Sequence, residues 1–520
     1  MTEDAAAEGS LDESSQGQSA EQVDDLSYAR ERLFITKDVD QLLGMLKDTK
    51  HRLPRTLGWF DVLILGIGAI IGAGIFVLVG VVTALYAGPG VVLSFILVGI
   101  VCIIVALCYS ELASMLPIAG SSYTYSYASI GEIVAWMVAW SLVLEYSVGA
   151  GAVAVGWSGY IGGLLQSVGV VLPKAITTDP SNGGVINLPA MLIVLGLTAL
   201  LYRGTKESAR FNMILVATKL AVIGMFLIGG LFYFNPAHFT PFMPYGAGGV
   251  LTGGALVFFA YLGFESLATT AEEVKDPQRD MTIGIIGSLS ITTLLYIGIA
   301  VVLIGMVAYT DIDIKQPLAA ALVSVGQPGM ANVLAIGALF GITSVLMVSL
   351  LAQPRIYFAL ARDGLLPGKL ARIHPRFGTP ALPTLVSGFS IALVAGITPI
   401  TTAAAVANVG TLFAFILVCL SVPLLRKRAP DARRPFRMPF NPILPIIGVI
   451  SCIGLMLSLF IEVPLSAVVM VAWMGCGLLL YANYGYYHSR VATERGYPDA
   501  RWEPDDEPSG DESVAGHGGD

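Results

Sequence analysis

Apolar runs long enough to cross a lipid bilayer recur along almost the whole chain, and this feature restricts the fold more than any other. A helix needs about 20 apolar residues to span the hydrocarbon core, where its backbone polar groups must bond within the segment. Charged residues make up 13% of the 520 positions, about half their share in soluble domains. The sequence therefore predicts an all-α polytopic membrane protein. Twelve spans are expected, at 60–86, 90–110, 132–166, 187–202, 211–234, 249–270, 281–308, 328–352, 381–397, 402–425, 441–461 and 464–487.

Positive charge divides unevenly between the two sides of these spans. Lys174 and Lys315 lie in loops that follow odd-numbered spans. Almost all other lysines and arginines precede the first span, follow the last or lie in loops after even-numbered spans. Because loops rich in Lys and Arg stay in the cytoplasm, we expect both termini to be cytoplasmic and the protein to span the plasma membrane.

Both ends of the chain are acidic. Residues 1–50 and 491–520 are rich in acidic and small residues, and such segments bury too little apolar surface to fold alone. We expect the first to be a largely disordered cytoplasmic tail and the second an acidic cytoplasmic tail. A functional docking role for these tails stays open as an alternative.

The sequence lacks the patterns that enzymes and nucleic-acid-binding proteins need. It contains no nucleotide-binding loop, metal-ligand cluster or nucleophile triad, and no basic face interleaved with aromatic residues. Its five cysteines all lie in apolar runs, which is typical of small core residues rather than of a disulfide or zinc framework. We therefore expect no enzymatic activity, no cofactor, no metal ion and no nucleic-acid partner.

One lysine lies inside a predicted span. Lys219 follows Arg210 by a helical distance of about 13 Å, which places it near the middle of a hydrocarbon core about 30 Å thick. A charged group at that depth is costly and usually functional, so we favour a coupling cation site or a proton-switched group. A structural lysine bonded to backbone carbonyls is the alternative. Glu145 and Glu265 could join it in a polar interior, or could each be a satisfied structural acid.

Two spans contain glycines where a membrane helix should be strongest. The first reads GIGAIIGAGIF at 66–76, and the second carries Gly253, Gly254 and Gly263 within 249–270. Each opens a block of five spans, and interrupted helices at matching positions of two halves are typical of inverted repeats with a binding site between them. Glycines that serve close helix packing are the alternative.

Unwound backbone at such a break can bind a small zwitterion. Free N–H groups at the start of a half-helix favour an anion, and free carbonyls at the end of the preceding half-helix favour a cation. An amino acid carries both a carboxylate and an ammonium group. The breaks therefore favour an amino acid as the ligand.

Four stretches resemble the amino acid–polyamine–organocation superfamily, and its cationic amino acid transporter branch in the twelve-helix microbial form most closely. They are GIGAIIGAGIF, CYSELASMLPIAGSSYTYSYASIGE at 108–132, LVFFAYLGFESLATTAEEVKDPQRDMTIGI at 256–285 and RIYFALARDGLLPGKLARIHPRFGTPALPT at 355–384. The resemblance implies a LeuT-type fold with a 5+5 inverted repeat and broken helices 1 and 6. It also implies a transporter domain at 51–490, with repeats at about 56–234 and 249–426 and two extra helices at 441–487.

The resemblance further implies roles for individual residues. Backbone amides of the first break would hold the substrate carboxylate, and the backbone of the sixth span would hold its ammonium group, with Phe259 as a gate. Glu145 and Glu265 would flank the side-chain pocket, and Lys219 would take the place of the cation bound by sodium-coupled relatives. Many relatives carry a hydroxyl residue where this chain has Ala73, so one bond to the carboxylate is lost here. The implied substrate-binding residues are Ile70, Gly72, Ala73, Gly74, Phe259, Ala260, Leu262, Glu145 and Glu265, and the coupling residues are Lys219, Thr343 and Ser344.

Together these features predict a secondary transporter that brings amino acids into the cell by proton symport and alternating access. An exchanger, a sodium-coupled transporter and a non-transporting amino acid sensor are the alternatives. The substrate could be a cationic or a small apolar amino acid. We expect the protein to be a monomer whose partners are the amino acid, the proton and the lipid bilayer.

Overall fold

The computed structural model describes residues 27–38, 55–117, 120–203, 209–374 and 379–502. Within these ranges the chain is helical and forms no strand longer than an isolated bridge. Among the described residues, nine helices are long and apolar enough to cross a membrane. Three shorter apolar helices, Trp59–Ile70, Leu188–Tyr202 and Ala381–Ile397, match the remaining predicted spans. The prediction of a LeuT-type helical membrane protein is thus confirmed.

Every predicted span coincides with at least one helix. The twelfth continues beyond its main helix through a π-helical turn, Tyr481–Gly485, into Tyr486–His488. The first and sixth are made of shorter pieces, which the next section describes, and each of the other ten is built on one main helix. These are α5 (Val91–Met115), α7 (Glu132–Ser167), α9 (Leu188–Tyr202), α10 (Ala209–Leu231), α12 (Pro277–Met306), α14 (Pro328–Arg362), α15 (Ala381–Ile397), α16 (Ile400–Arg428), α17 (Ile443–Glu462) and α18 (Pro464–Leu480).

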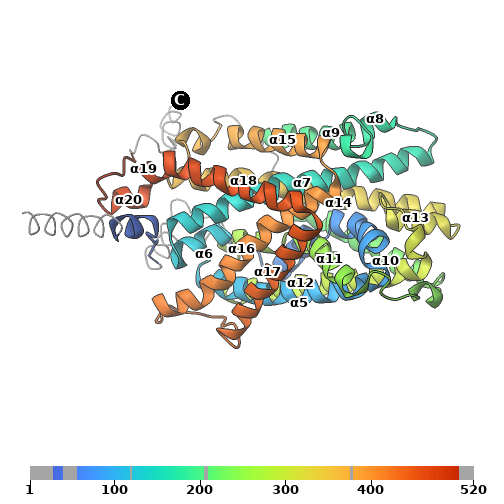
Figure 1. Ribbon diagram of the computed structural model, residues 1–520, viewed down its shortest axis with the longest axis horizontal. Coiled ribbons are helices and arrows are strands. Elements are labelled where there is room, and N and C mark those ends of the chain that lie inside the picture. The colour runs from blue at the N-terminus through green and yellow to red at the C-terminus, as the bar shows by residue number, and fades with distance from the viewer. Residues whose placement is uncertain (1–26, 39–54, 118–119, 204–208, 375–378, 503–520) are drawn as a thin grey trace, which may run out of the picture.

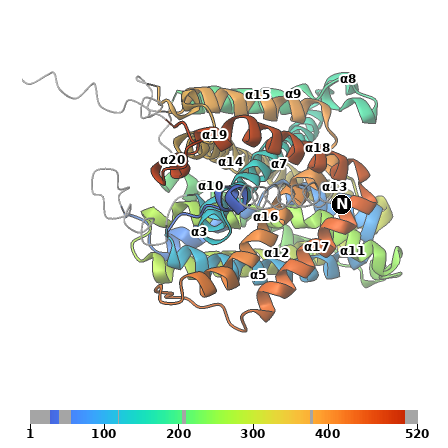
Figure 2. The ribbon, with the colours of Figure 1, turned by 60° about the vertical axis from the view of Figure 1, so that its left-hand side comes forward.

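Helix α7 forms the centre of the bundle. It packs against α14, α15 and α16, while α12 packs against α5 and against α3 (Trp59–Ile70), the first half-helix of span one. Figure 1 shows α9 and α15 along one edge and α5 and α12 along the opposite edge, and Figure 2 keeps this arrangement. Short helices close the ends: α8 (Lys174–Thr177) and α13 (Pro317–Ser324) lie at one end, and α6 (Ser121–Ser129), α19 (Tyr486–His488) and α20 (Arg490–Glu494) at the other (Figure 1).

The cysteines are free. Cys102, Cys108, Cys419 and Cys452 are buried, as expected of core residues, whereas Cys476 on α18 is exposed. The prediction that the cysteines are core residues therefore holds for four of the five.

The parts of both tails that the structure describes are docked on the bundle. Residues 27–33 form a helix, and the segments 27–38 and 486–502 meet beside α6 in what we call the terminal clamp. Arg495 donates to the Thr36 carbonyl, and Glu132 N–H donates to the Ile35 carbonyl over 2.9 Å. Of the tails predicted at 1–50 and 491–520, residues 1–26, 39–50 and 503–520 lie outside the described residues.

A fully buried ion pair holds the clamp. Arg32 and Glu132 both have 0% exposed side chains, and Arg32 Nη1 lies 3.2 Å from Glu132 Oε1. The same carboxylate accepts the Tyr127 hydroxyl at 2.5 Å, the Tyr481 hydroxyl at 2.8 Å and the Ser489 hydroxyl. Because buried charge is stable only when paired and hydrogen-bonded, this network fixes the N-terminal segment to α7.

A second ion pair continues the clamp at the end of α14. Lys37 Nζ lies 2.7 Å from Asp363 Oδ2, and the Tyr123 hydroxyl of α6 donates to the same oxygen at 2.5 Å. Burial opposes ionisation of Asp363, but the charges of Lys37 and Arg362 and these hydrogen bonds outweigh it, so the pKa of the carboxyl lies below its ordinary value. Asp363 is therefore charged and bonded at neutral pH.

Candidate functional site

The first span breaks where the glycines predict. Helix α3 (Trp59–Ile70) is followed by Ile71, whose backbone is extended with φ −75° and ψ 104°. A π-helical turn begins at Gly74. The next helical bonds run from the N–H groups of Ile75 and Phe76 to the Gly72 carbonyl. One short unwound segment thus separates two half-helices, as predicted.

The sixth span breaks once, at Leu262 and Gly263. Helix α11 (Gly246–Val257) continues as a 3₁₀ turn over Phe258–Tyr261, Leu262 is extended, and a 3₁₀ segment runs over Phe264–Glu273. Gly263 has φ +113°, which favours glycine. Gly253 and Gly254 lie inside α11, so the prediction that they interrupt the span is wrong. A Cβ at Gly253 would lie 2.9–3.0 Å from side-chain atoms of Ser94, Ala87 and Val82, which shows that close packing explains this glycine.

The two breaks touch each other, and glycine makes the approach possible on both sides. A Cβ at Gly74 would lie 2.3 Å from the Cα of Ala260, and a Cβ at Gly263 would lie 2.6 Å from the Ala69 carbonyl oxygen. Both distances are far below any real Cβ contact. A side chain at either position would push the two broken helices apart.

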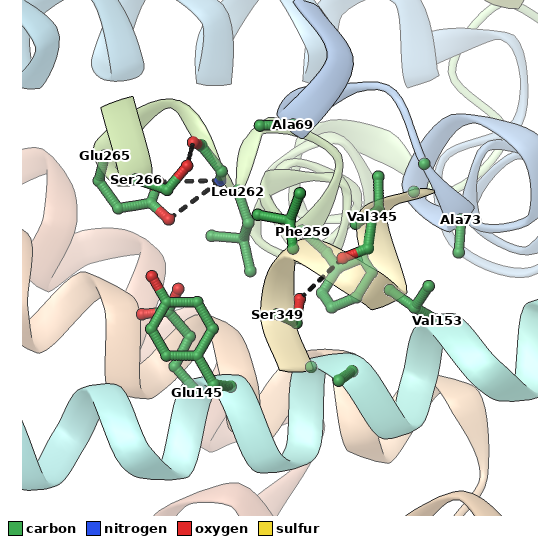
Figure 3. A pocket seen from close by; sticks show the side chains of 17 residues that line it. Ala69, Ala73, Glu145, Val153, Phe259, Leu262, Glu265, Ser266, Val345 and Ser349 are labelled. Atoms are coloured by element: carbon green, nitrogen blue, oxygen red, sulfur yellow. Dashed lines mark hydrogen bonds between the residues drawn. The ribbon is translucent and has the colours of Figure 1, made fainter. Parts of the chain in front are cut away.

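A small cavity of about 50 Å³ lies between the breaks and α7. Such a volume holds a few waters, since one needs at least about 10–15 Å³, and sites for small molecules usually measure about 300–1,000 Å³. In the described conformation the cavity is therefore narrower than a typical small-molecule site. Figure 3 shows Phe259 and Leu262 between the two breaks, with Glu145 on α7 below them. Seven of the nine predicted substrate-binding residues line the cavity: Gly72, Ala73, Gly74, Phe259, Leu262, Glu145 and Glu265.

The other two predicted residues lie next to the cavity with their carbonyls engaged. The hydroxyl of Tyr296 on α12 lies 3.0 Å from the Ile70 oxygen and 2.9 Å from the Ala260 oxygen. One hydroxyl thus bridges the end of the first half-helix and the turn before the second break. A ligand ammonium that uses either carbonyl must share it with this hydroxyl or displace it.

Both acids point into the cavity without a cationic partner in the described part of the chain. Both oxygens of Glu265 accept the Gly263 N–H, at 3.1 and 2.9 Å. Glu145 Oε2 is buried without any hydrogen-bond partner among the described groups. An uncompensated carboxylate is costly in such a place, so a proton or a cationic ligand group would stabilise this pair.

Lys219 lies at the end of the first half-helix. Its side chain is 0% exposed, and Nζ donates to the carbonyls of Gly68 at 2.6 Å and Ile71 at 3.0 Å. The ammonium thus caps the carbonyl end of α3, where the helix dipole favours a cation. No carboxylate forms an ion pair with it among the described residues.

Thr343 and Ser344 lie on α14 but do not bond to Lys219. Thr343 accepts the Trp157 indole N–H at 3.1 Å and donates to the Leu339 carbonyl at 2.7 Å. Ser344 donates to the Gly341 carbonyl at 2.8 Å. Gly341 itself packs on Lys219, since a Cβ there would lie 3.1 Å from Lys219 Cγ. The two hydroxyls are therefore neighbours of the lysine through the helix backbone only.

Several polar residues at or beside the site were not predicted, among them Tyr146, Ser266 and Ser349, which line the cavity. Besides Tyr296, Asn408 on α16 is 0% exposed, and its amide donates to the carbonyls of Ala255 at 2.8 Å and Leu256 at 3.3 Å, just before the second break. Both residues interrupt apolar runs, and a polar side chain at membrane depth is itself a functional signal. This signal identifies Tyr296 and Asn408 as candidates from the sequence, but it does not predict which backbone carbonyls they contact.

Comparison with known proteins places the site in context. A family described as "Amino acid permease" matches residues 57–479. The chain is similar to a protein named methylthioribose transporter from Bacillus subtilis, 44% identical over 88% of this chain and 98% of that protein. It is also similar to the branched-chain amino acid permease BcaP of the same organism, 40% identical over 88% of this chain and 99% of that protein. The vacuolar cationic amino acid transporter 4 of Arabidopsis thaliana is 38% identical over 76% of this chain and 67% of its own length.

Proposed function

The chain belongs to the amino acid permease family of the amino acid–polyamine–organocation superfamily, and from this membership we propose that it imports amino acids by proton symport. It is a multi-pass membrane transporter, not an enzyme. Its relatives include a branched-chain amino acid permease and cationic amino acid transporters, which supports amino acids as substrates.

The two breaks supply complementary groups for an amino acid backbone. The N–H groups of Gly72, Ala73 and Gly74 would bind the carboxylate, because they begin the second half-helix, where the dipole favours an anion. The carbonyls around Ala260 would take the ammonium group. Glu145 would face the side chain and could pair with a cationic one.

Lys219 carries the coupling, and its contacts with Gly68 and Ile71 are the observation on which this proposal rests. When charged, the ammonium donates to the carbonyls at the end of α3 and holds this half-helix in place. Lysine can lose its proton in apolar surroundings, as arginine cannot. A neutral amine is a weaker donor, so proton release would free the half-helix to move and open the site.

The surrounding architecture fits alternating access. The cavity is too small for most amino acids, so α3 and the sixth span must shift against α7 and α14 to admit one. We place repeat one at about 56–234, repeat two at about 249–426 and the extra helices at 441–487. Both termini would lie in the cytoplasm of a cell-membrane protein, since the clamp and the cationic loops share one end of the bundle.

One relative suggests a different substrate. The protein named methylthioribose transporter is 44% identical to this chain, and methylthioribose is a neutral thioether sugar without carboxylate or ammonium groups. Such a ligand would leave the amides of the first break and the two acids without charged partners. The geometry thus favours amino acids, and methylthioribose is the second candidate.

Uptake by the purified protein in proteoliposomes tests the proposal. Labelled leucine, alanine, arginine and methylthioribose would each be offered with an inward proton gradient, with a sodium gradient, and with amino acid preloaded inside. We expect accumulation of amino acids under the proton gradient alone. Uptake only against preloaded amino acid would indicate an exchanger, sodium dependence would indicate sodium coupling, and ligand binding without any flux would indicate a sensor.

A further inference from the structure

The loop that joins α16 to α17 carries a dense group of cations. Within 426–437 lie six of the chain's 29 lysines and arginines. In Figure 1 this loop is the orange turn that projects at the lower left, beyond the other helices. We call residues 426–440 the cationic loop. The transport site described above makes no use of it.

Two of the six cations anchor the loop to the bundle. Arg426 binds both oxygens of Glu111 at the end of α5, with Nε at 2.8 Å and Nη2 at 2.6 Å, and Met438 N–H donates to the same carboxylate at 2.7 Å. Arg434 donates to backbone carbonyls, among them those of Leu425 at 2.9 Å and Ala429 at 2.7 Å. These bonds fix the shape of the loop before any ligand binds.

The other four cations face outward. Lys427, Arg428, Arg433 and Arg437 are exposed, and none forms an ion pair in the part of the chain that the structure describes. Asp431 is the single acid of the loop. A preorganised group of cations with so little compensation attracts an anion.

Apolar surface adjoins this charge. Phe440 is 75% exposed, and its backbone has φ +50°, a conformation that bulky residues rarely adopt. Along the next helix, Ile443 and Ile450 are 62% and 64% exposed. Because α17 is one of the membrane-spanning helices, these isoleucines face the lipid acyl chains. An anionic group beside the loop and hydrocarbon along the adjoining helix together make up the chemistry of a phospholipid, which an acidic peptide supplies only in part.

We propose that the cationic loop binds the headgroup of an anionic phospholipid, with Phe440 at the headgroup level and the acyl chains along α17. Lys/Arg clusters beside a membrane helix bind anionic lipids, and each guanidinium can bind a phosphate through two donors. The proposal goes beyond the transport function and does not depend on the substrate or on the coupling ion.

Lipid retention by the full-length protein tests this inference. Native mass spectrometry would count phosphatidylglycerol and phosphatidylcholine of equal acyl chains bound to the wild type and to a variant with K427Q, R428Q, R433Q and R437Q. The anchors Arg426 and Arg434 stay intact, so the loop should keep its shape. The control variant removes four exposed cations elsewhere on the protein, with K275Q, R279Q, K369Q and R372Q.

We expect the loop variant to lose its preference for phosphatidylglycerol by about tenfold or more, while the control variant keeps most of it. Equal losses in both variants would show attraction by overall charge and would overturn the proposal. So would an unchanged preference in the loop variant. A crosslink from the loop to residues 503–520, with lipid retention independent of the loop, would assign the loop to the chain's own acidic tail instead.

Discussion

The chain buries charged groups in two regions and treats them in opposite ways. At the clamp end, Glu132 and Asp363 each bond to a cation and to tyrosine hydroxyls. At mid-membrane, Glu145 and Glu265 have no cationic partner among the described residues, and Lys219 bonds only to carbonyls. Both regions are buried, so burial alone does not distinguish a functional charge from a structural one.

The difference lies in what each group still lacks. A carboxylate with four donors can gain little from a ligand, and breaking its bonds would destabilise the fold. A carboxylate without a cationic partner can be stabilised strongly by a cationic group of the substrate. An ammonium that is bonded only to neutral backbone carbonyls can lose its proton more readily than one in an ion pair. We therefore assign the paired charges to the scaffold and the incompletely paired ones to transport.

Lys219→Met should have the largest effect on transport. Without a group that can take up and release a proton, accumulation driven by the proton gradient should disappear, while downhill exchange and folding persist. The measurement is uptake in proteoliposomes with and without the gradient. Lys315→Met, which changes an exposed lysine in a loop after an odd-numbered span, is the matched control. This variant should accumulate substrate normally. If Lys219→Met still accumulates substrate under the proton gradient, Lys219 has a structural role and does not couple transport to protons.

Gly74→Ala tests the contact between the two breaks. Its new methyl group would meet the Ala260 backbone at 2.3 Å, and forcing a methylene into a packed site costs about 1–3 kcal/mol, so the uptake rate should fall about tenfold or more. Gly224→Ala is the control, because a Cβ there meets nothing within 4 Å. Equal rates in the two variants would mean that the breaks separate freely and that their contact has no role.

Glu145→Gln and Glu265→Gln should change selectivity rather than abolish transport. A bond to a charged group contributes about 1.5–3 kcal/mol, so competition by arginine should weaken about tenfold or more, while competition by leucine should change little. Inhibition constants against labelled alanine give this ratio. If both competitors weaken equally, the acids support the site without reading the side chain.

Glu132→Gln should leave selectivity unchanged and destabilise the protein. It leaves Arg32 buried without its counter-charge, which costs about 3–5 kcal/mol, and the melting temperature in detergent should fall by several degrees. Glu145→Gln should melt close to the wild-type temperature, since one of its two carboxylate oxygens, Oε2, has no partner to lose among the described groups. A larger loss of stability in Glu145→Gln than in Glu132→Gln would reverse the assignment of the two regions.

Much of this arrangement could be predicted from the sequence because membrane helices are local structures. Apolar runs locate the spans, the glycines of GIGAIIGAGIF locate the first break, and the distance from Arg210 gives the depth of Lys219. The alternative prediction for Lys219, a structural lysine bonded to backbone carbonyls, also agrees with the contacts that this lysine makes. These contacts are compatible with the proposed coupling role of Lys219, because the carbonyls belong to the broken helix that would move during transport.

The remaining features depend on contacts between distant parts of the chain. Arg32 and Glu132 are 100 residues apart, and Tyr296 is 226 residues from Ile70. Gly253 and Gly263 look alike in sequence, yet one packs inside a helix and the other permits a break, because only the neighbouring helices distinguish them. No local pattern carries that information.

The most direct test of the central claim follows substrate and protons together. Proteoliposomes containing a pH-sensitive dye would receive a labelled amino acid outside, without an imposed gradient, and uptake and lumenal pH would be recorded at once. Our account predicts that the lumen acidifies as substrate enters and that Lys219→Met takes up substrate without acidification. Substrate entry into wild-type vesicles at constant lumenal pH would contradict proton symport and the role assigned to Lys219.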